Sequence, residues 1–260
     1  MQSDKSATTP RGITVHFNEA AHTYWHIEQG SQLEAVARHT SVTQLTGGFF
    51  PAFDEDATAQ RCAAKSGVAK EELIAAWHTK RDTACELGTR VHAIAEDCIL
   101  NRQPRHQPRD NTERILFRNV WIAASKLREA NKILGAEMLV ANTRARIAGQ
   151  IDLALRSPDG AVWLIDWKTN ARIRTESQYG NTCLPPVTHL PECEVSKYSL
   201  QLSAYEWILR SEGYITKPQT PVHRSIIHIA PDGAREIPLP DLSAEIRDCV
   251  ISHLSEPLPF

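Results

Sequence analysis

Two aspartates and one lysine stand in apolar stretches of the sequence, where a charged side chain is costly to bury. Asp152 ends the stretch GQID at 149–152, and Asp166 and Lys168 lie within WLIDWK at 163–168. If both stretches are strands, side chains two residues apart share a face, so the two carboxylates and the ammonium can converge. The pattern is typical either of a buried structural ion pair or of a site that binds an ion and does chemistry.

The spacing of these residues, together with three further motifs in chain order, resembles a nuclease signature. The 13 residues 153–165 separate Asp152 from the triplet DWK. GTRVH at 88–92 and Glu137 precede them, and QLSAY at 201–205 follows. The set is similar to the PD-(D/E)xK nuclease superfamily and, within it, to the RecB-type branch, which includes lambda-exonuclease-like phage enzymes and the mitochondrial genome maintenance exonuclease. The Pro of the motif is absent, and the resemblance covers roughly residues 41–209.

The resemblance implies a fold and a reaction. The fold would be α/β, with a restriction-endonuclease-like core in which a central mixed β-sheet is flanked by helices, plus N-terminal helical additions. The reaction would be metal-dependent hydrolysis of DNA phosphodiester bonds by an exonuclease, in DNA processing, repair or recombination. A structure-specific endonuclease and a non-catalytic DNA-binding module of the same fold are the alternatives. The intact set of Asp152, Asp166 and Lys168 favours catalysis over the non-catalytic module.

The cofactor that the resemblance implies is Mg²⁺ or Mn²⁺. Hard oxygen ligands suit these ions, and Asp152, Asp166 and the backbone carbonyl of Trp167 would provide them. RecB-type enzymes carry a metal-binding histidine at the position of His92, the last residue of GTRVH. Lys168 could orient the attacking water and stabilise developing charge, or it could act as the base if burial or the metal lowers its pKa. Both roles stay open.

Other polar residues are tied to the site by single features of the sequence. Gln201 lies in an apolar helical stripe, where an unpaired amide costs roughly 1 to 3 kcal/mol, so we expect it to have a fixed partner. In the family, the helix of Gln201 and Tyr205 lies along the site and helps to place DNA or a catalytic group. Glu96, four residues after His92, could hold a ligand or a water. Glu137 matches an acidic position of the family, with an ion pair to an arginine as the alternative.

Basic residues crowd one region, although the chain as a whole has a formal charge of −2 and therefore does not coat nucleic acid by bulk charge. Residues 102–132 contain eight basic and three acidic side chains. Arg114 and Arg118 share one helix face and are the first candidates for DNA contacts. The alternative for all basic candidates is solvated surface charge. Further candidates flank the strand motifs: Arg144, Arg146, Arg172 and Arg174.

Hydrophobic periodicity and turn residues predict the elements that position these side chains. A small hairpin around Gly30 is predicted within 16–37, a short helix begins at Ser41, and the pattern over 54–101 is helical. A long helix at 111–134 would stop at Gly135. In the strand at 149–155, three apolar side chains would share the face opposite to Asp152: Ile151, Leu153 and Leu155. The remaining predictions are strands at 137–142, 161–167 and 222–230, helices at 198–209 and 241–254, and a long loop or lid at 175–194.

These elements divide the chain into an N-terminal extension, 1–40, and a single nuclease domain, 41–260. The domain would be helical over 41–135 and contain the sheet core in 136–260. The start of the sequence lacks the apolar core of a signal peptide, and no apolar run approaches the roughly 20 residues of a membrane span. We therefore expect a soluble intracellular protein of the cytoplasm or nucleoid. Its partners would be DNA, as single strands or duplex ends, and a helicase or recombination protein, because no helicase motif is present.

Six cysteines without a C-x-x-C motif are expected to be reduced thiols. Some nucleases of the RecB-type branch hold an iron–sulfur cluster with one upstream and three downstream cysteines. The closely spaced downstream pair is missing among Cys183, Cys193 and Cys249. We therefore expect no iron–sulfur cluster.

Overall fold

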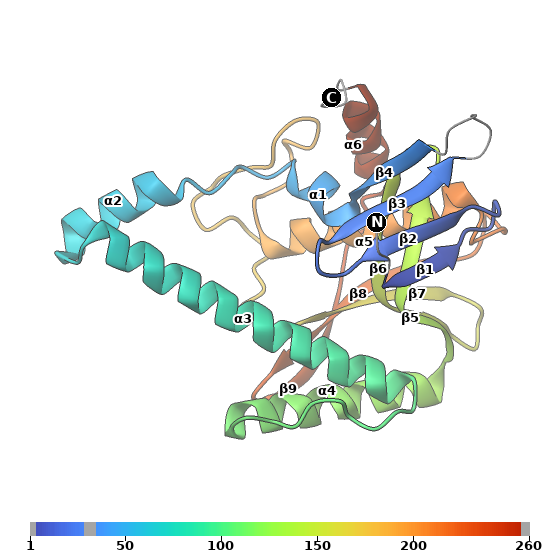
Figure 1. The fold of residues 1–260 in the computed structure, drawn as a ribbon, viewed down its shortest axis with the longest axis horizontal. Helices are drawn as coiled ribbons and strands as arrows, with labels where there is room; N and C mark the ends of the chain where they lie inside the picture. Colours follow the sequence, from blue (N-terminus) through green and yellow to red (C-terminus); the bar gives the residue numbers. More distant parts are fainter. Residues whose placement is uncertain (1–3, 29–34, 256–260) are drawn as a thin grey trace.

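The computed structural model describes residues 4–28 and 35–255, and a mixed sheet lies at its centre (Figure 1). Within these residues the sheet has nine strands in the order β1-β2-β3-β4-β6-β7-β8-β9, with β5 paired to β6. The strands are β1 Lys5–Thr8, β2 Thr14–Asn18, β3 Thr23–Glu28, β4 Ala35–Ser41, β5 Lys132–Asn142, β6 Ile147–Arg156, β7 Val162–Lys168, β8 Val222–Ala230 and β9 Gly233–Pro238. The helices are α1 Val42–Gly47, α2 Glu55–Ser66, α3 Lys70–Ile99, α4 Asn111–Ala130, α5 Glu194–Glu212 and α6 Ser243–Ser255.

Helices cover both faces of the central strands, which confirms the predicted α/β class. Apolar side chains of α1, α5 and α6 form one core cluster with β6, β7 and β8. Side chains of α3 and α4 form a second cluster with the same three strands. No helix among the described residues is long and apolar enough to cross a membrane.

Apolar side chains of β6 on either side of Asp152 lie on opposite faces of the sheet, so the prediction that Ile151, Leu153 and Leu155 share one face is wrong. Ile151 packs in the cluster of α5, whereas Leu153 and Leu155 pack in that of α3 and α4. The strand that pairs with β6 also changes at Asp152. β6 pairs with β4 only through Ile147 and Ala148 on one side of this point, and with β7 from Leu153 onwards on the other.

The N-terminal strands join the same sheet as the core. β3 and β4 are antiparallel, which confirms the predicted hairpin, although its turn around Gly30 lies outside the described residues. Strands β1 and β2 were not predicted. Phe17 of β2 and Tyr24 of β3 pack with Leu139, Ala141 and Ala148 of β5 and β6 in a third apolar cluster.

The end of the helix predicted for 111–134 is wrong. α4 ends at Ala130, and Gly135 lies within β5, at a shift in its register with β6. A Cβ added to Gly135 would lie 2.9 Å from the Met138 Cβ, so the glycine permits a close approach in a strand instead of ending a helix. Strand β9, which pairs with β8, was also missed.

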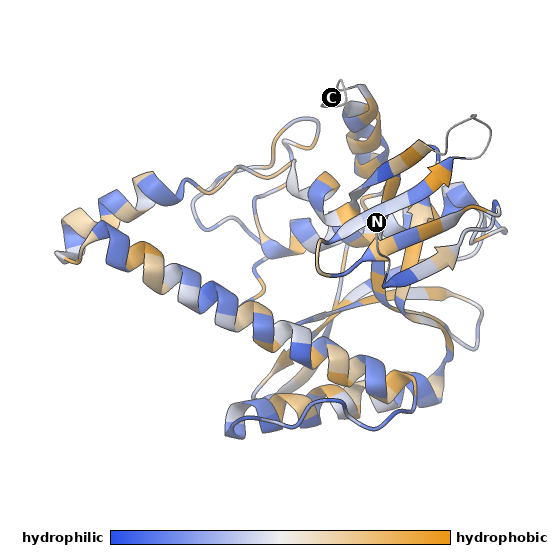
Figure 2. Cartoon of the chain, viewed as in Figure 1, coloured by the Kyte–Doolittle hydropathy of each residue, from blue (hydrophilic) through white to orange (hydrophobic). Residues whose placement is uncertain are grey.

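Helix α2 and the first half of α3 form an arm that projects from the body of the molecule (Figure 1). At 30 residues, α3 is about 45 Å long. Its buried residues all lie between Val91 and Ile99, where it packs on the sheet. The projecting half mixes hydrophilic and hydrophobic side chains (Figure 2). Residues 169–193 are largely irregular, in agreement with the predicted loop or lid, apart from an isolated bridge between Thr182 and Pro191.

Candidate active site

His92 reaches the sheet because α3 packs its buried stripe against β7. Nε2 of His92 lies 2.8 Å from the carbonyl oxygen of Trp167, and Nδ1 lies 3.3 Å from Oδ2 of Asp152. A carbonyl oxygen only accepts, so Nε2 donates its proton to Trp167. Nδ1 then either carries a second proton or turns its lone pair toward the Asp152 carboxylate. A cation beside the two atoms would stabilise the second arrangement.

Asp152 lies where β7 separates from β6. The pairing of these strands stops at Leu153 and Ile165, and one further step of the same register places Asp152 opposite Asp166. The side chain of Asp152 replaces the missing ladder bond, because its Oδ2 accepts a hydrogen bond from the Trp167 amide at 2.9 Å. The N–H and the carbonyl of Trp167 are thus held by Asp152 and His92.

Asp166 is almost completely buried and has two partners. Its Oδ2 lies 2.5 Å from Nζ of Lys168, and its Oδ1 accepts a hydrogen bond from Nε2 of Gln201 at 3.3 Å. Asp166 is therefore the fixed partner expected for Gln201. The Lys168 ammonium also lies 4.7 Å from the centre of the Tyr198 ring, a cation–π contact.

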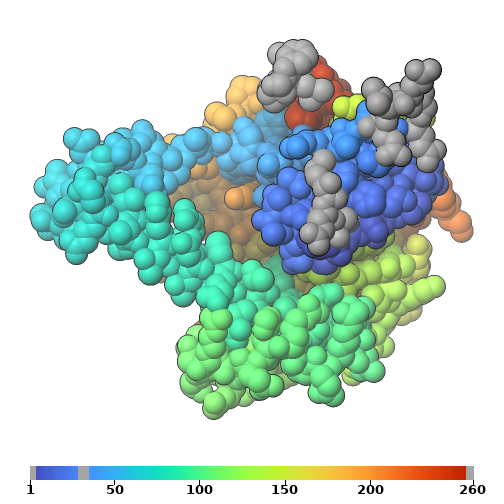
Figure 3. Space-filling model, in the orientation of Figure 1, coloured from blue at the N-terminus to red at the C-terminus, as the bar shows by residue number. Residues whose placement is uncertain are grey.

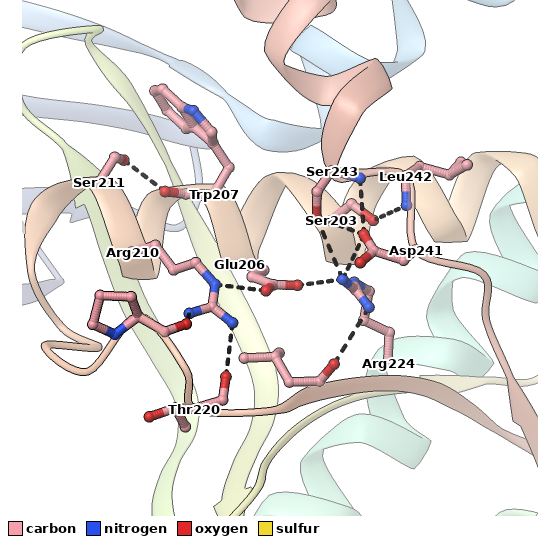
Figure 4. Close-up of polar contacts among 12 residues, drawn as sticks. Ser203, Glu206, Trp207, Arg210, Ser211, Thr220, Arg224, Asp241, Leu242 and Ser243 are labelled. Carbon is pink, nitrogen blue, oxygen red and sulfur yellow. Dashed lines mark hydrogen bonds and ion pairs between the residues drawn. The ribbon is translucent and has the colours of Figure 1, made fainter.

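A buried polar network holds α5, the helix that carries Gln201, against β8 and the start of α6 (Figure 4). Glu206 pairs with Arg210 of the same helix and with Arg224 of β8, and Arg224 also reaches Asp241 at 2.7 Å. The Ser203 hydroxyl accepts a hydrogen bond from the Leu242 amide at 3.1 Å. These contacts fix the position of α5 relative to the sheet and so restrict where Gln201 can lie.

Tyr205, one helical turn after Gln201, packs against Gly149 on β6. A Cβ added to Gly149 would lie 2.9 Å from Cε1 and 3.0 Å from the hydroxyl oxygen of Tyr205. The glycine of the GQID motif is therefore required for the close approach of α5 to β6.

Glu137 of β5 completes the acidic group. The register of β5 and β6 places it opposite Asp152, between the pairs of Ala136 with Leu153 and Met138 with Ile151. Its φ of 46° is in the left-handed region. Among the described residues, Glu137, His92 and Asp152 form a group whose ligand atoms lie within 4.8 Å of one another.

The electrostatics of this group fit a divalent cation. Burial and the charge of Asp152 raise the pKa of Glu137 to about 7. Burial raises the pKa of Asp166 to about 6, although the Lys168 ammonium opposes the change. Burial acts to lower the pKa of Lys168, but the carboxylates of Asp166 and Asp152 outweigh it, and this pKa lies above its usual value. Three carboxylates, one imidazole and a carbonyl are an oxygen-rich ligand set of the kind that binds Mg²⁺ or Mn²⁺, and the Lys168 ammonium lies beside it.

Comparison with known families agrees with this geometry. A family model for the PD-(D/E)XK nuclease superfamily matches residues 57–247. The chain belongs to the PD-(D/E)XK nuclease superfamily. No curated protein matches it. Membership indicates metal-dependent nuclease activity, and the matched range contains the carboxylates, Lys168, His92 and Gln201.

Glu96 and several basic residues of this nuclease are engaged in ion pairs or backbone hydrogen bonds, and Glu96 and Arg105 line the same cleft as His92 and Glu137. The Glu96 carboxylate lies 2.8 Å from Arg105, which also binds Asp97. Arg109 pairs with Glu86, and Arg128 donates to the Cys98 carbonyl. Part of the basic region predicted at 102–132 therefore stabilises the structure.

The arginines predicted to contact DNA are widely separated in the nuclease. Arg114 and Arg118 line a cavity of about 250 Å³ on α4, and the carboxylates do not line it. Arg146 lies in the turn between β5 and β6 and is ion-paired with Glu28. It precedes Asp152 by six residues, a separation of about 20 Å along an extended strand. Arg144 lies in the same turn. Arg172 and Arg174 follow β7, where Arg174 is ion-paired with Glu194 and lines a cavity with Tyr198.

Sequence reasoning missed residues that the N-terminal strands bring to the site. Lys5 and Glu19 line a cleft of about 650 Å³ together with His92, Glu96 and Glu137. No local pattern marks Lys5 or Glu19 as site residues. Tyr198 was visible only as part of the apolar stripe of α5. The contact between Tyr198 and Lys168 depends on how α5 packs against β7, which the sequence pattern does not specify.

Proposed function

We propose that the chain is a metal-dependent DNA exonuclease that hydrolyses phosphodiester bonds. The observation that carries the proposal is the convergence of three carboxylates, an imidazole and an ammonium at the point where β6 and β7 separate. Three carboxylates and one ammonium in a half-buried site leave net negative charge that a divalent cation would compensate, and the bound cation would in turn attract a phosphate group.

We propose that Asp152, Asp166, His92 and the Trp167 carbonyl hold the metal, with Glu137 next to them. When bound, Mg²⁺ or Mn²⁺ supplies positive charge to the phosphate and lowers the pKa of a bound water. The Trp167 carbonyl has two lone pairs, so it can accept from His92 and still serve as a ligand. Donation by Nε2 to that carbonyl leaves Nδ1 as the ligand atom of His92 and fixes the orientation of the ring.

Lys168 acts on the substrate side of these ligands, where its ion pair with Asp166 holds it. In hydrolysis, a water oxygen bonds to phosphorus, the bond from phosphorus to the leaving oxygen breaks, and the leaving oxygen takes up a proton. The Lys168 ammonium, held by Asp166 and the Tyr198 ring, is suited to bind a phosphate oxygen as negative charge develops. Gln201 holds the other oxygen of Asp166 and so keeps that carboxylate in one orientation.

The RecB-type branch and the exonuclease activity are supported by two motifs. GTRVH brings His92 to the Trp167 carbonyl, and QLSAY brings Gln201 to Asp166. Both motifs thus have contacts at the carboxylates that the resemblance predicts. A role in DNA processing, repair or recombination, with a helicase or recombination protein to expose ends, follows from this assignment.

The test is the time course of product lengths on end-labelled single- and double-stranded DNA with Mg²⁺. An exonuclease releases short products from ends and leaves a closed circle intact. Cutting of the closed circle would replace the proposal with a structure-specific endonuclease. Binding without any metal-supported cleavage would replace it with a non-catalytic module.

A further inference from the structure

Another cavity lies away from the carboxylates, between α2 of the projecting arm and the loop 169–193. It has a volume of about 530 Å³. The space-filling view shows the surface hollowed between the arm and the body of the molecule (Figure 3). On the side of α2, it is lined by one face of the helix with the spacing i, i+3, i+4 and i+7: Thr58, Arg61, Cys62 and Lys65. On the side of the loop it is lined by Tyr179 and Asn181.

Tyr179 is the unusual member of this lining. It is 79% exposed, which for a large aromatic ring leaves an open apolar face in water. Its hydroxyl accepts a hydrogen bond from Nε2 of Gln178 at 3.1 Å, and Oε1 of the same Gln178 amide accepts a hydrogen bond from Arg174. Arg174 is held by Glu194 at the start of α5. The ring is therefore tethered at its hydroxyl end, while its face stays accessible.

The same contacts connect this cavity to the catalytic residues. Arg174 lines the cavity that it shares with Tyr198, which has a volume of about 350 Å³ and is also lined by Lys197. Tyr198 in turn carries the Lys168 ammonium on its ring. Basic and aromatic side chains thus follow one another from Lys168 through Tyr198 and Arg174 to Tyr179.

We propose that the cavity between α2 and Tyr179 binds the single-stranded part of the DNA substrate, with one base stacked on the Tyr179 ring and neighbouring phosphates at Arg61 and Lys65. An accessible aromatic face beside cationic side chains is the arrangement by which proteins bind single strands without reading their sequence. Duplex DNA does not fit this chemistry, because its bases are stacked on each other and unavailable to the ring. The inference rests on the proposed function, since it assigns a substrate class to the same nuclease.

The test measures binding of labelled oligothymidylates of increasing length to the full chain, with a chelator present so that nothing is cleaved. We expect Tyr179→Ala to weaken binding of the long strands on the order of 10-fold and to leave the affinity for the shortest strands at the wild-type value. Tyr179→Phe, which keeps the ring, should retain most of the affinity. Lys65→Ala should weaken binding most at low salt, whereas Lys217→Ala, an exposed lysine in the loop between α5 and β8, should have no effect.

An abasic nucleotide moved along the strand separates stacking from a general loss of affinity. In the wild type one position should be sensitive to loss of its base, and Tyr179→Ala should remove that sensitivity. An identical abasic profile in both proteins, or an equal loss of affinity for duplex and single strand, would overturn the proposal. Because no cleavage is measured, failure of the nuclease assignment would show instead as absent Mg²⁺-supported cleavage by the wild type.

Discussion

Asp152 on β6 accepts a hydrogen bond from the backbone amide of Trp167 on β7, at 2.9 Å. The two strands stop pairing directly at this point, so the carboxylate takes the place of a backbone acceptor. The bond fixes the peptide groups on either side of Trp167 and therefore the position of its carbonyl, which His92 contacts. The Asp152 side chain thus lies where the two strands separate and fixes the backbone of the DWK motif next to the candidate metal ligands.

Asp152→Asn should abolish Mg²⁺-supported cleavage while leaving the fold intact. The amide oxygen can still accept the bond from Trp167, but the charge that a hard cation requires is lost. DNA binding should survive or tighten, because a negative charge near phosphate has been removed. The measurements are cleavage of end-labelled DNA, calorimetric Mn²⁺ binding and thermal unfolding, with the exposed Asp232→Asn as the control. Near-normal cleavage by Asp152→Asn, or by Asp166→Asn, would remove these residues from the metal site.

Lys168→Ala should lower the single-turnover rate by on the order of 10² or more, because a positioned charge is lost from the reaction. DNA affinity should change little. The deletion leaves Asp166 buried without its cation, so thermal stability is measured in parallel. If the folded fraction of the variant cuts at the normal rate, Lys168 is only half of a structural ion pair. Lys132→Ala, on β5, is the control for removal of an exposed lysine.

Gly149→Ala should destabilise the protein by about 1 to 3 kcal/mol, because the new Cβ would overlap the Tyr205 ring. Urea unfolding measures the change. The cost should be smaller in a Tyr205→Ala background, which provides space for the methyl group. Gly88→Ala is the matched control, and it should raise the free energy of unfolding. The new Cβ would meet only Thr169 Oγ1 at 3.7 Å, and alanine stabilises a helix relative to glycine by about 0.5 to 1 kcal/mol. Equal effects of the two substitutions would contradict the packing argument.

The Asp97–Arg105 pair should make stability depend on acid pH. Burial acts to raise the pKa of Asp97, but hydrogen bonds and charge from Arg105 outweigh it, and the pKa lies below its usual value. A carboxylate with a depressed pKa stabilises the fold above the pKa of the unfolded chain, about 4, and this stabilisation is lost as the pH falls below it. Asp97→Asn should lower the free energy of unfolding at pH 7 and flatten its fall below about pH 4. The control for loss of an exposed carboxylate is Asp232→Asn.

Replacing Arg114 and Arg118 together by alanine tests whether α4 meets DNA. Each lost phosphate contact should lower the slope of log affinity against log salt by about 0.7 to 0.9. Binding measured from low to high salt gives this slope, and Arg235→Ala on β9 is the control. An unaltered slope would place the DNA elsewhere, and the position of Arg174 beside Tyr198 makes that side of the site the alternative.

The sequence by itself predicted candidate residues for the site and determined the faces of several elements. A two-residue period places Asp166 and Lys168 on one face of β7, and they are ion-paired in the structure. Strand β8 and the helical pattern that contains α3 were predicted closely, because a run of apolar residues or a helical period is a local property. The nuclease superfamily was also recognisable, since its motifs depend on residue types and order.

Only the tertiary structure decided which of these residues meet. Glu137 lies opposite Asp152 because of the register between β5 and β6, and His92 contacts Trp167 across 75 positions of the chain. The N-terminal strands enter the sheet through a short pairing of β4 with β6, which no local pattern signals. Packing also overrode local preference at Gly135, which reads as a helix stop and lies in a strand. Periodicity specifies the face of an element, whereas register and partners depend on side chains and backbone groups that are distant in sequence.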